Sequence, residues 1–101
     1  MAQNNRTFRI FIVEDEPMQR RLIKYVLESD PDHEVHVFDN GKACLNHLHL
    51  QPDLISLDYY LPDLDGISVL QRIKNYNKNI KVVVLSGQKD IATAIKLIKQ
   101  F

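Results

Sequence analysis

Short strand-like runs alternate with amphipathic helical stretches along this chain, and no other feature of the sequence constrains the fold as strongly. Runs rich in β-branched and aromatic residues predict strands at residues 8–13, 33–38, 53–58 and 81–85. Apolar stripes at helical spacing predict helices at residues 18–29, 42–50, 66–76 and 91–101. Alternation of this kind requires parallel strands joined by right-handed crossovers, so the predicted fold class is α/β with a doubly wound parallel sheet.

Length, charge and cysteine content narrow the class of protein further. The 101 residues suffice for one domain with one core, which we expect at residues 8–101 after a disordered lead-in at 1–7. Thirteen basic residues balance thirteen acidic ones, so neither nucleic acid nor a membrane is an expected direct partner. The single cysteine, Cys44, excludes an internal disulfide and is interpreted as a small packing residue. One cysteine and no signal peptide suit a cytoplasmic protein.

Polar side chains follow three of the predicted strands at their carboxyl ends. Glu14 and Asp15 follow the first strand, and Asp58 ends the third. Ser86 and Gly87 follow the fourth. The carboxyl ends of parallel strands meet at one edge of the sheet, where open α/β sheets bind their ligands. We therefore expect these residues to form one site.

The chemistry of that expected site is metal-assisted phosphoryl transfer. Two carboxylates about 4 Å apart repel by roughly 4 kcal/mol at an effective dielectric near 20, so the cluster needs a compensating cation. Mg²⁺ binds one or two carboxylates and keeps positions for water and phosphoryl oxygens, which makes Glu14 and Asp15 candidate ligands. Ser86 and the Gly87 amide can donate to phosphoryl oxygens. Asp58 is then the nucleophile that forms an acyl phosphate.

Three motifs in this order and spacing resemble the receiver domain of two-component response regulators: FIVEDEP at 11–17, LDYYLPDLDG at 57–66 and VLSG at 84–87. The resemblance covers residues 9–100. It implies a flavodoxin-like (CheY-like) sheet in the strand order 2-1-3-4. It also implies a protein that takes a phosphoryl group from a histidine kinase or phosphotransfer protein and then switches its partners. Such a domain is not a turnover enzyme, although it assists its own phosphorylation and dephosphorylation.

The resemblance also implies a role for each site residue. Asp58 would be the phosphoacceptor, and the Mg²⁺ ligands would be Glu14, Asp15, Asp58 and the backbone carbonyl of Tyr60. Ser86 would be the switch hydroxyl, and the Gly87 amide would bind the phosphoryl group. Pro62 and Gly66 would shape the loop beyond the acceptor. Tyr60 and Gln88 would tune the rate of dephosphorylation.

A receiver domain also has a fifth strand and a fifth helix, and the sequence given stops at Phe101, before either would occur. We therefore expect an incomplete receiver that lacks an aromatic switch residue and a phosphoryl-pairing lysine. The strand that includes Val82 and Leu85 would form a bare edge, and one face of the sheet would be uncovered. An exposed apolar edge invites pairing with another chain, so a homodimer or higher oligomer through this edge is expected.

Two other functions and one basic segment complete the sequence-based interpretation. The main alternative is a receiver-like interaction module that is not phosphorylated. A Mg²⁺-dependent phosphohydrolase usually has a second acid two residues after its nucleophile, and Tyr60 at that position argues against this class. Glu16 and the basic run Arg20, Arg21 and Lys24 are interpreted as solvated charges on and near the first helix.

Overall fold

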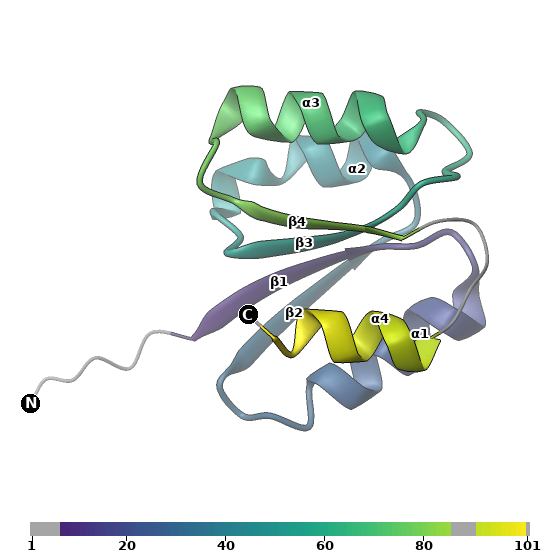
Figure 1. Cartoon of the computed structure of the whole chain (residues 1–101), viewed down its shortest axis with the longest axis vertical. Helices are drawn as coiled ribbons and strands as arrows, with labels where there is room; N and C mark the ends of the chain where they lie inside the picture. Colours follow the sequence, from purple (N-terminus) through teal and green to yellow (C-terminus); the bar gives the residue numbers. More distant parts are fainter. Residues whose placement is uncertain (1–6, 86–90, 101) are drawn as a thin grey trace, which may run out of the picture.

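Four parallel strands in the order β2-β1-β3-β4 form the centre of the molecule, which confirms the predicted sheet (Figure 1). The computed structural model describes residues 7–85 and 91–100. Its elements are β1 (Phe8–Val13), α1 (Pro17–Leu27), β2 (His33–Phe38), α2 (Gly41–Asn46), the 3₁₀ helix η1 (Leu48–Leu50), β3 (Leu54–Asp58), α3 (Gly66–Tyr76), β4 (Lys81–Leu85) and α4 (Ile91–Ile98). The longest helices among these residues, α1 and α3, have 11 residues each and are too short to span a membrane.

The boundaries of three helices differ from the sequence prediction, and the smallest difference is in α1, which spans Pro17–Leu27 where 18–29 was predicted. The segment predicted as one helix over residues 42–50 is divided into α2 and η1. The side chain of Asn40 caps the start of α2 by accepting from the amide of Ala43 at 2.8 Å. Gln51, with φ of 61°, closes η1 in the left-handed conformation. The last helix, predicted over residues 91–101, ends at Ile98 in the structure, and Phe101 lies outside the described residues.

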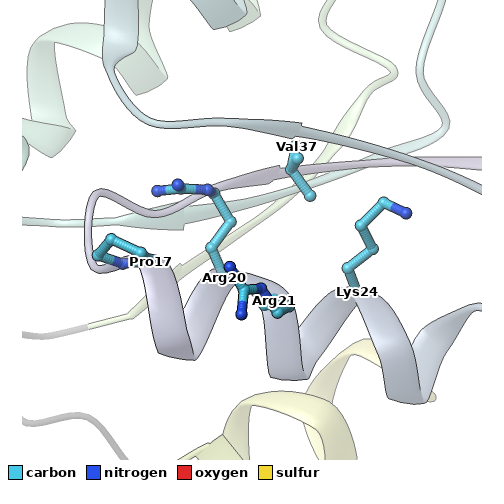
Figure 2. A pocket seen from close by; sticks show the side chains of 5 residues that line it. All are labelled: Pro17, Arg20, Arg21, Lys24 and Val37. Atoms are coloured by element: carbon cyan, nitrogen blue, oxygen red, sulfur yellow. The ribbon is translucent and has the colours of Figure 1, made fainter.

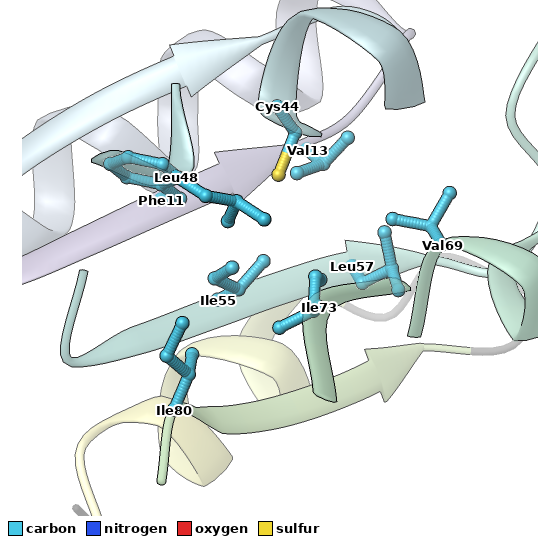
Figure 3. Packing of buried hydrophobic residues seen from close by; sticks show 9 residues of the cluster. All are labelled: Phe11, Val13, Cys44, Leu48, Ile55, Leu57, Val69, Ile73 and Ile80. Atoms are coloured by element: carbon cyan, nitrogen blue, oxygen red, sulfur yellow. The ribbon is translucent and has the colours of Figure 1, made fainter. Parts of the chain in front are cut away.

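One face of the sheet packs against α2 and α3. Alternate strand residues point to this face because successive side chains of a strand point to opposite sides. Figure 3 shows this cluster, which contains Phe11, Val13, Ile55 and Leu57 from the strands with Cys44, Leu48, Val69, Ile73 and Ile80. Burial raises the pKa of the Cys44 thiol to about 12, so this side chain is a packing residue, as the sequence indicated.

The opposite face packs against α1 and α4. The chain crosses the sheet in one direction from β1 to β2 and in the other from β2 to β3 and β4. Right-handed crossovers therefore place α1 on the face opposite α2 and α3. Helix α4 lies beside α1 (Figure 1) and buries Ile98, only 2% exposed, against the cluster that contains Ile10, Ile12, Ile23, Leu27 and Leu54. The expectation of an uncovered sheet face is wrong, because α4 covers that face.

Candidate functional site

Three carboxylates meet at the carboxyl edge of the sheet. Val13 pairs with Leu57 in the parallel register, so Glu14 and Asp58 follow at the same level of neighbouring strands. Carboxylate oxygens of Glu14, Asp15 and Asp58 lie within 4.8 Å of one another. Glu14 is 2% exposed and Asp58 1% exposed, whereas Asp15 is exposed to solvent. The structure thus brings together the three acids that the sequence assigned to one site.

Backbone contacts hold the two acids at the end of β1. The amide of Glu14 donates to the carbonyl of Phe38 at 2.9 Å, which extends the β1–β2 ladder into the site. The Glu14 carboxylate accepts from the amide of Glu16 at 3.1 Å. Glu16 itself caps α1 by accepting from the amide of Gln19 at 2.8 Å. Glu16 is exposed as expected, but its capping role was not predicted, because glutamate is not among the preferred N-cap residues.

A basic hollow of about 180 Å³ lies next to this loop. It is lined by Pro17, Arg20, Arg21, Lys24 and Val37 (Figure 2). Arg20 is more than a solvated charge, since its Nη1 donates to the carbonyls of Glu14 at 2.9 Å and Asp15 at 3.2 Å. Lys24 pairs instead with Glu28 at 2.9 Å along the helix surface. A contact from a helix back to the preceding loop has no signature in the sequence.

The loop after β3 folds closely around Asp58. The Asp58 carboxylate accepts from the amide of Tyr60 at 3.1 Å, and the amide of Tyr59 donates to Leu85 at 2.8 Å. The amide of Gly66 donates to the carbonyl of Tyr59 at 2.8 Å. A Cβ at residue 66 would lie 2.8 Å from the Cα of Tyr59, so only glycine fits this approach. The chain therefore needs glycine where the resemblance implied a loop-shaping residue.

Two further aspartates fix the ends of that loop. Asp65 caps α3 by accepting from the amide of Ser68 at 2.8 Å. Asp63 accepts from the amides of Gly41 and Lys42, each at 2.8 Å, and so ties the loop to the start of α2. Burial alone would raise the pKa of Asp63, but the amides of Gly41 and Lys42 and those of the loop together lower it. This contact of Asp63 could not be predicted from the sequence.

Some of the other predicted site residues lie at the surface of the loop, and others lie outside the described part of the chain. Pro62 lies exposed in the loop, and the Tyr60 side chain is 64% exposed, with its ring edge-on to Tyr59. Ser86, Gly87 and Gln88 lie outside the described residues. Leu85, the last residue of β4, pairs with Asp58 in the parallel register.

The donor set is chemically suited to a hard divalent cation. Three carboxylates converge, and two of them are buried, where uncompensated negative charge is costly. Carboxylate oxygens are the ligands that Mg²⁺, Ca²⁺ and Mn²⁺ prefer.

Comparison with known proteins decides the family. The family model described as the response regulator receiver domain matches residues 10–100. The chain belongs to the response regulator receiver family. This receiver domain is 41% identical over 81 residues to a protein-glutamate methylesterase/protein-glutamine glutaminase of Rhodospirillum centenum, covering 78% of this chain and 21% of that protein. It is 39% identical over 84 residues to the corresponding protein of Oceanobacillus iheyensis, covering 81% and 24%. The chain thus spans less than a quarter of the length of these two relatives.

Solved receiver structures share the fold. The response regulator domain of Thermotoga maritima CheB superposes with a TM-score of 0.72 at 26% identity, covering 91% of this chain and 72% of that one. The Mn²⁺-bound form of response regulator Rcp1 gives a TM-score of 0.68 at 34% identity, covering 89% and 74%. The sequence-based assignments of family and fold are confirmed, and the acidic cluster can hold a divalent cation.

Proposed function

We propose that this receiver domain accepts a phosphoryl group on Asp58 from a histidine kinase or phosphotransfer protein and uses Mg²⁺ for this reaction. The observation that carries the proposal is the convergence of Glu14, Asp15 and Asp58 at the carboxyl edge of the sheet. The complete acidic cluster favours a phosphoacceptor over an unphosphorylated interaction module. The domain itself is proposed to be a phosphoacceptor and not a turnover enzyme.

The proposed reaction is an in-line displacement at phosphorus. A carboxylate oxygen of Asp58 forms the new P–O bond while the P–N bond to the donor imidazole breaks, and the electron pair leaves with the imidazole. Glu14 and Asp15, with Asp58 and the carbonyl of Tyr60, would hold Mg²⁺. When bound, Mg²⁺ neutralises charge on the phosphoryl oxygens. The Tyr60 amide orients the Asp58 carboxylate by donating to Oδ1.

Four residues are proposed to act beside Asp58. Ser86 and the Gly87 amide would donate to phosphoryl oxygens. Tyr60 and Gln88 are proposed to tune the rate at which water removes the phosphoryl group. The exposed ring of Tyr60 is accessible for such a role.

The decisive experiment is intact-mass spectrometry after incubation with Mg²⁺ and acetyl phosphate. We expect one phosphoryl adduct on the wild-type chain, none on Asp58→Asn, and loss of the adduct when EDTA is added first. Asp32→Asn is the matched control, because Asp32 is an exposed acid in the α1–β2 connection, at the opposite edge of the sheet. An adduct that persists in Asp58→Asn, or a wild-type chain that gains none, would reject the proposal.

A protein is the proposed phosphodonor because α1 presents an apolar stripe directly after the acidic loop. Met18, Leu22 and Tyr25 recur at helical spacing and are 70%, 44% and 75% exposed. Exposed apolar side chains in contiguous rows mark protein interaction sites. Met18→Ser with Tyr25→Ser should slow transfer from a phosphorylated histidine-phosphotransfer domain and leave the rate with acetyl phosphate unchanged. Equal effects on both donors would reject this surface.

We also propose that two copies associate through β4. Among the described residues β4 pairs only with β3, and its Val84 is 37% exposed. A right-handed crossover that continued the sheet past β4 would need its helix on the α3 face, whereas α4 lies on the α1 face. Antiparallel pairing centred on Val83 would set Lys81 against Leu85 of the second copy and so avoid repulsion between like charges.

Light scattering coupled to size exclusion tests this association. We expect a dimeric mass for the wild-type chain and a monomeric mass for Val84→Lys, because an edge lysine opposes strand pairing. A monomeric wild-type chain at high concentration would reject the proposal.

The cytoplasm is the proposed location, in keeping with the single buried cysteine.

A further inference from the structure

Arg20 makes a contact that neither the fold nor the family assignment explains. It lies in the first turns of α1, and its guanidinium reaches back to the loop that carries Glu14 and Asp15. Its Nη1 is 2.9 Å from the carbonyl oxygen of Glu14 and 3.2 Å from that of Asp15. Figure 2 shows the Arg20 side chain directed toward the Pro17 end of the helix, while Lys24 points away from that end.

The two carbonyls belong to the residues whose carboxylates form the acidic cluster. Those carboxylates repel each other and Asp58, and this repulsion tends to open the loop before a cation binds. A hydrogen bond from a charged donor to a carbonyl is stronger than one between neutral groups. One guanidinium nitrogen that bonds both carbonyls therefore resists opening of the loop and limits the directions that the two side chains can take.

We propose that Arg20 is a positioning residue that orders the Glu14–Asp15 loop for a divalent cation, a role that rests on the proposed metal site. It does not touch the cation and acts through the backbone of the two ligands. Groups that orient metal ligands from outside the coordination sphere commonly change metal affinity by about 10- to 100-fold when they are removed.

The sign of the effect separates this role from plain electrostatics. A positive side chain near the acidic cluster repels a cation, so loss of its charge alone would strengthen metal binding. Loss of a positioning contact weakens metal binding. Arg21 provides the comparison, because it lines the same hollow, is exposed on the same helix and has no hydrogen bond to the loop among the described contacts.

The experiment measures the affinity of the full chain for Mn²⁺ from the electron paramagnetic resonance signal of the free ion. We expect Arg20→Met to bind Mn²⁺ about 10-fold more weakly than the wild-type chain. Arg20→Lys should recover part of this loss, because a lysine retains the charge but lacks the planar fork of donors. Arg21→Met should bind as tightly as the wild-type chain or more tightly. Urea unfolding of each variant in EDTA identifies any effect that comes from loss of folding.

Unchanged or stronger Mn²⁺ binding by folded Arg20→Met would overturn the inference. If that variant does not fold, Arg20→Lys decides, and wild-type affinity in it would also overturn the inference. If the cation does not bind at the acidic cluster at all, the result is different, because Asp15→Asn would then bind Mn²⁺ as tightly as the wild-type chain.

Discussion

At the residue scale, Asp63 is a single side chain that joins two separate segments. It accepts from the amides of Gly41 and Lys42, which precede it by 22 and 21 residues. These amides open α2 and need an acceptor. We expect Asp63→Ala to lower the free energy of unfolding by about 1 kcal/mol, as for loss of a helix cap. Urea unfolding measures this loss, and Asp63→Asn, which keeps one carbonyl acceptor, should lose less.

The pH dependence of this contribution has a definite sign. The pKa of Asp63 is lowered in the folded chain, so the carboxylate stabilises the fold above the unfolded pKa. That stability is lost as the pH falls through the folded pKa. The difference between wild-type and Asp63→Ala should therefore shrink in acid, and a difference that grows in acid would contradict the role given to Asp63.

The loop after β3 also requires glycine at residue 66. A Cβ there would meet the backbone of Tyr59 at 2.8 Å, and backbone atoms cannot turn aside as a flexible side chain can. Gly66→Ala should lower the free energy of unfolding by about 1–3 kcal/mol, as expected for overpacking. Ile67→Ala is the neighbouring control, since that side chain is 44% exposed and its removal should cost much less. Equal losses in urea unfolding would show that the close approach is not limiting.

At the scale of elements, a charged network joins β1 to β2 at the end of the sheet away from the site. Glu34 accepts from Arg9 at 2.8 and 3.1 Å and lies 2.6 Å from His36 Nε2. Hydrogen bonds from Arg9 and then His36 lower the pKa of Glu34 to about 2. The Glu34 side chain is 38% exposed, so solvent screens its ion pair with Arg9, and this pair stabilises the fold by about 0.2–1 kcal/mol.

This network predicts a pH-dependent difference between wild-type and Glu34→Gln. The carboxylate contributes its stability above the unfolded pKa of 4.5 and loses it as the pH falls through about 2. Glu34→Gln should thus be less stable near neutral pH, and the two curves should converge between those values. Chemical denaturation over this range tests the prediction, and a constant difference would contradict it.

The placement of α4 is a second test at the scale of elements. Ile98 is 2% exposed among the residues that pack on the α1 face, whereas its neighbour Leu97 is 37% exposed. We expect Ile98→Ala to cost about 2–5 kcal/mol and Leu97→Ala much less. Nuclear Overhauser contacts between Ile98 and Leu27 would show directly that the two helices share this face. A larger loss of stability for Leu97→Ala than for Ile98→Ala would contradict this placement of α4.

At the scale of the whole molecule, cation binding and folding are linked. The three carboxylates converge only when β1 and β3 pair, so the proposed cation site exists in the folded chain and not in the unfolded one. Mg²⁺ at about 100 times its Kd should then add about 2.7 kcal/mol to the free energy of unfolding. Thermal unfolding with and without Mg²⁺ measures this gain. Asp15→Asn should show a smaller gain, and an equal gain would place the cation elsewhere.

The elements, their order and the acids at one edge of the sheet could be predicted from the sequence. Strand and helix periodicities are local properties of the chain, and parallel pairing of 8–13 with 53–58 then brings Glu14 and Asp58 together. The division of residues 42–50 into α2 and η1 could not be predicted in this way, because a 3₁₀ turn and an α-helix carry similar apolar spacing.

Contacts between groups that are distant in the sequence depend on the packed fold. Helix α4 has an apolar stripe that fits either face of the sheet by pattern, and packing of Ile98 beside Leu27 and Leu54 selected the α1 face. The contacts of Arg20 with the acidic loop and of Asp63 with the start of α2 depend on side chains reaching across space. Hydrogen bonds to backbone groups leave no periodic trace in a sequence, because every residue supplies the same carbonyl and every residue except proline the same amide.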